Sequence, residues 1–199
     1  MPANAQIATA LSKIGMVLRS EQWRQAEATS LTPTQAQILV HLAARGPARL
    51  TEVAREIAVT QPTASDAVAA LVRKQHVERC RDPEDGRAVL LQATAPGRRA
   101  AAALAVWPDA LLGAIDVLDT AEQAVFLKGL SKMIRALQQR GAIPVQRMCL
   151  NCRHFRPYAH ADAAQPHHCT FVDAAFGDAG LRLDCGDHVE AGAPEAPVE

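Results

Sequence analysis

The sequence lacks both a membrane span and a secretory leader. None of its apolar runs reaches about eighteen residues, the length at which a helix can cross a bilayer. The N-terminus, Met-Pro-Ala-Asn-Ala-Gln, has neither the basic segment nor the apolar core of a secretion signal. We therefore expect a cytosolic protein, cytoplasmic in location and with no membrane partner.

The sequence also lacks the residue pattern of a catalytic centre. A catalytic metal site needs an open coordination position and a general base, and no stretch of the chain points to that combination. We therefore predict that the protein is not an enzyme, with a zinc hydrolase as a distant alternative.

The chain has no net charge, because 21 Lys and Arg balance 21 Asp and Glu, but the charges are unevenly distributed. Residues 45–99 carry an excess of Lys and Arg, whereas residues 149–199 carry an excess of Asp and Glu. This asymmetry suits contact with DNA through the middle of the chain only. On charge alone, ordinary solvated surface is an equal alternative.

The pattern between residues 50 and 73 predicts two short helices joined by a tight turn. Ala58 and Val59 make the turn, Thr60 has the hydroxyl of a good N-cap, and Pro62 fits the first turn of the second helix. A pair of helices whose second member has a polar N-terminal face is typical of a helix-turn-helix. The apolar positions expected to face the core are Val53, Ala54, Ile57, Ala64, Val68, Leu71 and Val72.

A β-hairpin is predicted directly after these helices. Residues 77–80 and 88–92 read as strands, and the segment Asp-Pro-Glu-Asp-Gly between them is rich in turn residues. Arg81 and Arg87 lie on this hairpin, where a narrow minor groove would attract them. We expect Asp85 to orient the guanidinium of Arg87.

The stretch from Glu52 to Ser65 resembles the helix-turn-helix of the multiple antibiotic resistance regulator (MarR) family of winged-helix repressors, and Asp82-Pro-Glu-Asp-Gly-Arg-Ala88 resembles that family's wing. The resemblance covers roughly residues 5–140. Ala58 and Gln75 stand where the family usually has glycine. The resemblance implies a homodimeric transcriptional regulator, a repressor, that binds double-stranded DNA at a pseudo-palindromic operator. It also implies release of DNA by a small-molecule effector, which no residue here identifies.

The recognition helix is expected to enter the major groove and the wing the minor groove. Asp66, Ala69 and Ala70 offer few donors to base edges, so a protein-interaction adaptor that keeps the winged fold without reading DNA is an alternative. The candidate DNA-binding residues are Gln61, Thr63, Ser65, Asp66, Arg73, Arg81, Asp85 and Arg87.

Long apolar helices are predicted on both sides of the winged segment. One spans residues 4–28, and the last begins at Asp119, with Glu122 completing a capping box. Helices this apolar need a partner surface, and a two-fold dimer also places two recognition helices about one DNA turn apart. An intramolecular core helix is the alternative for the first. The expected buried stripes are Ile7, Leu11, Ile14 and Leu18 on the first helix and Val125, Phe126, Leu130, Met133, Ile134 and Leu137 on the last.

Four of the five cysteines fall in the last quarter of the chain: Cys149, Cys152, Cys169 and Cys185. In a cytosolic protein such clustering favours a metal over disulfides. The close pair suits one edge of a tetrahedral ion and the other two cysteines the opposite edge, and a segment this short and polar needs a staple. Zinc is favoured and an iron–sulfur cluster is the alternative, followed by disulfides or free thiols. His168 is a possible substitute ligand.

These patterns predict a mainly α fold with a small β-hairpin wing. Residues 1–30 and 95–144 form a helical dimerisation region, residues 31–94 the winged helix-turn-helix, and residues 145–190 a small loop-rich, metal-stapled module. Residues 191–199 are expected to be a disordered tail. A rival function is a metal, redox or iron–sulfur sensor in which the C-terminal cluster controls DNA binding.

Overall fold

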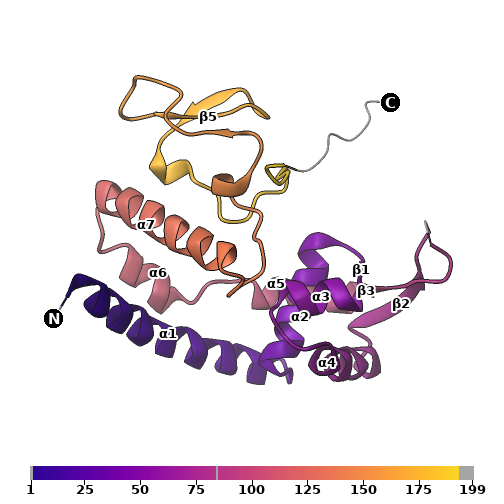
Figure 1. The fold of residues 1–199 in the computed structure, drawn as a ribbon. Coiled ribbons are helices and arrows are strands. Elements are labelled where there is room, and N and C mark those ends of the chain that lie inside the picture. The colour runs from indigo at the N-terminus through magenta and orange to yellow at the C-terminus, as the bar shows by residue number, and fades with distance from the viewer. Residues whose placement is uncertain (1, 84, 193–199) are drawn as a thin grey trace. The chain divides into compact units, whose positions relative to one another are not determined.

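The computed structural model describes residues 2–83 and 85–192 (Figure 1), and the side chains of residues 26 and 27 are not described. Most of the predicted disordered tail therefore lies outside the described residues. The chain divides into two compact units, Met1–Gly113 and Ala114–Glu199, which are taken separately below. Among the helices of the described ranges, none is long and apolar enough to cross a membrane.

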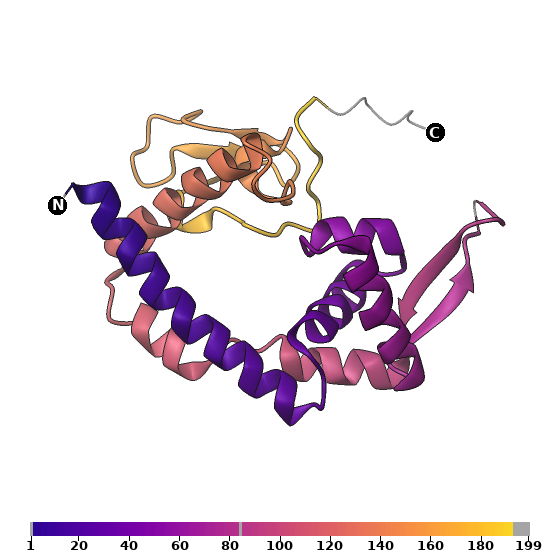
Figure 2. The same ribbon diagram turned by 60° about the horizontal axis from the view of Figure 1, so that its bottom comes forward.

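The first unit has the predicted winged helix-turn-helix. The hairpin strands pair antiparallel, with Val77 opposite Ala93 and Cys80 opposite Leu90, and β1 adds to the outer side of β3. Figure 2 shows this hairpin projecting from the helices of its unit. The elements in chain order are α1 (Ala3–Ala28), α2 (Pro33–Arg45), β1 (Ala48–Arg49), α3 (Leu50–Glu56), α4 (Gln61–Arg73), β2 (Val77–Arg81), β3 (Val89–Ala93) and α5 (Ala95–Leu104).

Local chemistry sets the ends of the recognition helix, α4. The Thr63 backbone N–H donates to the Thr60 hydroxyl at 3.3 Å, which confirms the predicted N-cap. The turn before α4 passes through Ala58 at φ +56°, and the turn after it passes through Gln75 at φ +59°. Both values are in the left-handed region that favours glycine. Ala58 and Gln75, which stand where the MarR family usually has glycine, therefore adopt the backbone conformation that glycine favours.

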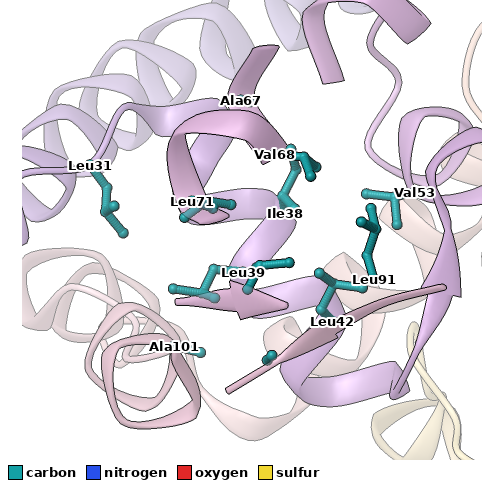
Figure 3. Close-up of a cluster of buried hydrophobic side chains, with 12 residues drawn as sticks. Leu31, Ile38, Leu39, Leu42, Val53, Ala67, Val68, Leu71, Leu91 and Ala101 are labelled. Atoms are coloured by element: carbon teal, nitrogen blue, oxygen red, sulfur yellow. The ribbon is translucent and has the colours of Figure 1, made fainter. Parts of the chain in front are cut away.

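The core of the first unit gathers residues from α2, α3, α4 and the hairpin (Figure 3). Ile38, Leu39, Val53 and Leu71 are fully buried there, and Val68 nearly so. Such a core fixes the rotation of α4, because turning the helix would expose its apolar side. Its polar side is therefore held outward.

One glycine in this unit is required by a close approach. A Cβ placed on Gly97 in α5 would lie 2.0 Å from the carbonyl oxygen of His76. That oxygen accepts a hydrogen bond from the Thr94 backbone N–H at 3.0 Å, just before α5 begins. The absence of a side chain at Gly97 thus allows α5 to pack against the base of the wing.

The second unit joins a long helix to a small antiparallel sheet of order β4-β5-β6. The grouping differs from the predicted organisation, because it places α7 with the cysteine-rich segment. Met148 is fully buried, and Gln138 of α7 donates to its sulfur at 3.4 Å. The short helix α6 (Asp109–Ile115) crosses the boundary between the units. The remaining elements are α7 (Thr120–Gln139), η1 (Cys149–Asn151), β4 (Phe155–Arg156), β5 (His167–Cys169), β6 (Ala174–Phe176) and η2 (Asp178–Gly180).

The apolar stripe predicted on α7 is not buried within the single chain. Val125, Phe126, Met133 and Leu137 are 70%, 43%, 40% and 41% exposed, whereas the buried residues of α7 are Ser131 and Gln138. The polar side is buried because the cysteine-rich segment packs on it through η1 and η2. The apolar stripe of α1 is likewise partly open, with Ile7 51% and Ile14 40% exposed.

Candidate nucleic-acid interface and cysteine-lined cavity

The N-terminal end of α4 presents polar side chains away from the core. Gln61, Thr63 and Asp66 are exposed and Ser65 is half-buried. The Thr63 hydroxyl lies 2.7 Å from that of Thr60, so it also belongs to the helix cap. The unpaired backbone N–H groups of a helix N-terminus favour phosphate, and these side chains surround them.

Arg73 is exposed near the other end of α4, about three turns away. On the wing, Arg81 and Arg87 are both exposed. Arg81 ends β2 opposite Val89, at the beginning of β3. The structure thus places all three predicted arginines at the surface of one unit, as contact with a polyanion requires.

The predicted role of Asp85 is wrong in one respect. Its carboxylate accepts the backbone N–H of Arg87 at 3.1 Å, which is a turn-type contact. Its other oxygen lies 3.4 Å from the Nη2 of Arg49, so the guanidinium that it meets belongs to Arg49 and not to Arg87. The turn directs the amide of Arg87 inward and leaves its side chain exposed.

Arg49 itself is a functional candidate that the sequence analysis missed. Its Nη2 donates to Asp82 Oδ2 at 2.8 Å, and the Asp82 side chain is only 11% exposed. The hydrogen bond with Asp82 raises the pKa of Arg49, and the charges of Asp82, Asp85 and Glu52 act in the same direction. This guanidinium ties the end of β1 to the start of the β2–β3 turn. No sequence pattern near Arg49 predicts its contact with Asp82, because this contact depends on the register of β1 with β3.

The second unit contains a cavity of about 300 Å³ onto which all four cysteines of the C-terminal segment open. Cys149 begins η1 and Cys152 directly follows it, Cys169 ends β5, and Cys185 is held by its backbone N–H, which donates to the Arg147 carbonyl at 2.8 Å. All are half-buried and carry free thiols. The cavity is otherwise lined chiefly by His154, Phe155, Phe171, Val172, Phe176 and Arg182.

Arg182 donates hydrogen bonds to two of these sulfurs. Its backbone N–H lies 3.3 Å from Cys149 Sγ, and its guanidinium lies 3.9 Å from Cys185 Sγ. Burial raises the pKa of the Cys149 thiol, the three neighbouring cysteines raise it further, and the Arg182 N–H partly opposes them. A metal bound here would have to displace the proton from this half-buried thiol.

The predicted tetrahedral zinc arrangement is not preformed. Within residues 2–83 and 85–192, no three His, Cys, Asp or Glu side chains are arranged to hold a metal ion. The possible substitute ligand, His168, does not line the cavity. Its ring nitrogens lie 3.2 Å from His160 Nε2 and 3.2 Å from Asp173 Oδ1.

A second missed feature is a half-buried polar contact that joins α7 to the sheet. Asp178 lies 2.9 Å from Nε2 of His167, which is 3% exposed, and 2.9 Å from Lys128 Nζ. Burial acts to raise the pKa of Asp178, but the hydrogen bonds from His167 and Lys128 outweigh it and lower the pKa. This carboxylate therefore helps to dock the sheet on α7.

Comparison with known proteins gives a partial match within the first unit. A family model described as the MarR family matches residues 29–88, from just before α2 to the wing. A comparison with curated proteins gives no match.

Solved structures with a similar fold include Streptococcus pneumoniae FabT in complex with DNA, with 24% identity and a TM-score of 0.61, covering 68% of this chain and 98% of that one. The Staphylococcus aureus MepR–DNA complex has 22% identity, a TM-score of 0.56 and coverage of 66% and 98%. Bacillus subtilis YusO has 19% identity, a TM-score of 0.53 and coverage of 67% and 96%. The chain therefore has the winged-helix fold of MarR-family transcription regulators.

Proposed function

We propose that this protein is a transcriptional repressor that binds a pseudo-palindromic operator as a homodimer. The observation that carries the proposal is the exposed polar end of α4 beside a wing with the exposed guanidinium groups of Arg81 and Arg87. In this reading α4 enters the major groove and reads base edges, while the wing follows the adjacent minor groove. Two of the structures with a similar fold are DNA complexes, which supports the same use here.

The homodimer is proposed from apolar surface that the described chain leaves uncovered. α1 exposes Ile14, Met16 and Trp23 at 40%, 62% and 64%, and α7 has an open apolar side. Monomeric proteins rarely expose large contiguous apolar patches. A second copy covers both helices and sets two recognition helices about 34 Å apart. Small-molecule release of DNA is part of the proposal through the family resemblance.

We also propose that Cys149, Cys152, Cys169 and Cys185 hold a metal centre. Two observations support this proposal. Four free thiols, from segments as much as 36 residues apart, line one cavity. The backbone N–H of Arg182 donates to one of their sulfurs. A centre of this kind makes the protein a candidate metal or redox sensor, in which the C-terminal unit controls DNA binding.

The main proposal is tested by fluorescence anisotropy with a duplex from upstream of the protein's own gene and a scrambled duplex of equal length. We expect tighter binding to the first, with two chains per duplex in sedimentation velocity. A folded dimer that binds neither duplex would favour the protein-interaction adaptor. Binding by a single chain per duplex would contradict the homodimer.

A further inference from the structure

We infer that the cysteine-lined cavity binds an iron–sulfur cluster of the four-iron type rather than a single zinc ion, an inference that rests on the proposed metal centre. Four cysteine thiolates are the usual ligands of such clusters, and they equally suit structural zinc. The chemical identity of the ligands therefore does not decide between the two. The volume of the cavity that the four thiols line distinguishes a cluster from a single ion.

The first argument is volume. A zinc ion binds four thiolates at about 2.3 Å, so the sulfurs close around it and leave no room for further atoms. The four thiols here open on about 300 Å³, roughly ten times the volume that a water molecule occupies in the liquid. A four-iron, four-sulfide core is an eight-atom cube with one thiolate at each iron. It suits a space of this size, which a single ion would leave mostly unfilled.

The second argument is the lining between the sulfurs. Phe155, Phe171 and Phe176 line the cavity together with Val172 and Ala174. An apolar wall limits the access of water to a bound group and so protects an acid-labile sulfide core. A single ion enclosed by its four ligands gains little from such a wall. Aromatic side chains are expected around a cluster, because its iron and sulfide atoms have surface that the four thiolates leave uncovered.

The third argument concerns charge. Four thiolates around a four-iron core of charge +2 leave an anionic centre, and hydrogen bonds to the sulfurs are one means by which proteins stabilise it. Arg182 supplies two, from its backbone N–H to Cys149 and from its guanidinium to Cys185. Its positive charge favours the more reduced cluster. We therefore assign Arg182 the role of a positioning residue that raises the reduction potential.

Metal analysis of the full-length protein, purified without air, tests the assignment. We expect about four iron and four sulfide per chain, a brown colour with broad visible absorption, and loss of both in Cys169→Ser. Reconstitution of the apoprotein uses equal amounts of ferrous and ferric iron with sulfide in one sample and zinc alone in another. One zinc per chain, without sulfide, overturns the cluster but leaves the metal centre standing. Neither metal, with the four cavity thiols titratable in the folded chain alongside Cys80, overturns both.

A second measurement tests Arg182 separately from folding. Arg182→Gln keeps the backbone N–H but removes the charge, so the cluster should still assemble and its midpoint potential should become more negative. Arg156→Gln is the matched control, because Arg156 is exposed on β4 and does not line the cavity. Equal potentials in the wild type and Arg182→Gln would overturn the role of Arg182. DNA binding, measured in parallel, reports on the proposed regulator independently.

Discussion

Arg49 and Asp82 lie 33 residues apart in the chain and meet at 2.8 Å, Nη2 to Oδ2, where β2 ends and the β2–β3 turn begins. The contact fixes one end of the β2–β3 turn to the residue that precedes α3. Arg49 is thereby occupied within the protein, whereas Arg81 and Arg87 remain exposed on the hairpin.

Replacing Arg49 with Gln should loosen the wing and weaken DNA binding without changing how affinity depends on salt. The salt slope counts phosphate charges neutralised on binding, and the Arg49 charge is already paired with Asp82. Hydrogen exchange of residues 77–93 should become faster than in the wild type. A shallower slope of log affinity against log salt would show instead that Arg49 meets phosphate directly.

Arg87→Ala should weaken binding to every duplex and reduce the salt slope by about one unit, because one charge that faces DNA is lost. The titration is repeated at several salt concentrations with specific and scrambled DNA. Arg140→Ala, exposed just after α7, is the control and should leave both quantities unchanged. Unchanged affinity and slope in Arg87→Ala would mean that the wing does not contact DNA.

Gln61→Ala should cost roughly 1–3 kcal/mol on the operator and little on scrambled DNA, since a side chain at the start of α4 is placed to meet a base edge. Gln37→Ala, an exposed glutamine on α2, removes the same group elsewhere in the unit and should bind normally. Equal losses on both duplexes would assign Gln61 to the DNA backbone.

Gly97→Ala should destabilise the first unit by about 2–3 kcal/mol, because the new Cβ meets a backbone carbonyl that cannot move without breaking its bond to Thr94. Urea unfolding followed by tryptophan fluorescence measures it, since Trp23 and Trp107 both lie in this unit. Gly113→Ala in α6, where no atom lies within 4 Å, should be neutral or stabilise by up to about 1 kcal/mol. Similar stabilities for the two variants would contradict the close packing of α5 on His76.

Asp178→Asn should destabilise the second unit at neutral pH by about 1–2 kcal/mol, because the contacts with His167 and Lys128 lose their charge. The folded pKa of Asp178 is lowered, so its stabilisation is present above the usual carboxyl pKa of about 4 and disappears as pH falls through the lower folded value. The wild type and the variant should therefore converge in acid. Hydrogen exchange of residues 167–169 at several pH values measures this, and a gap that persists at low pH would exclude the carboxylate as its source.

Sequence patterns predicted the elements whose causes are local. The Thr60 cap, the buried positions Ala64, Val68 and Leu71, and the hairpin all follow from periodicity and turn chemistry within a few residues. The Arg49–Asp82 contact was beyond such reasoning, because it requires the register of strands far apart in the chain. Phe126 and Met133 are exposed in the single chain, and an apolar stripe does not by itself reveal whether its partner lies in the same chain.

The Ala58 and Gln75 turns show a further limit of local reasoning. Glycine is the residue that φ values of +56° and +59° favour, yet the chain adopts them with side chains present. The packing of α3, α4 and the hairpin imposes these turns at a cost of about 1–2 kcal/mol each. Tertiary structure therefore overrides residue preference at both ends of the helix proposed to read DNA.

One side of α7 packs against the cysteine-rich segment, and the other carries the apolar residues proposed to meet a second copy. Because the proposed dimer and the proposed cluster would both use this helix, we expect the two binding events to be thermodynamically linked. If binding of the cluster strengthens subunit association by a given free energy, subunit association must strengthen cluster binding by the same free energy. A dilute protein would then lose its cluster more readily than a concentrated one, so cellular abundance would itself set the threshold at which the centre is lost.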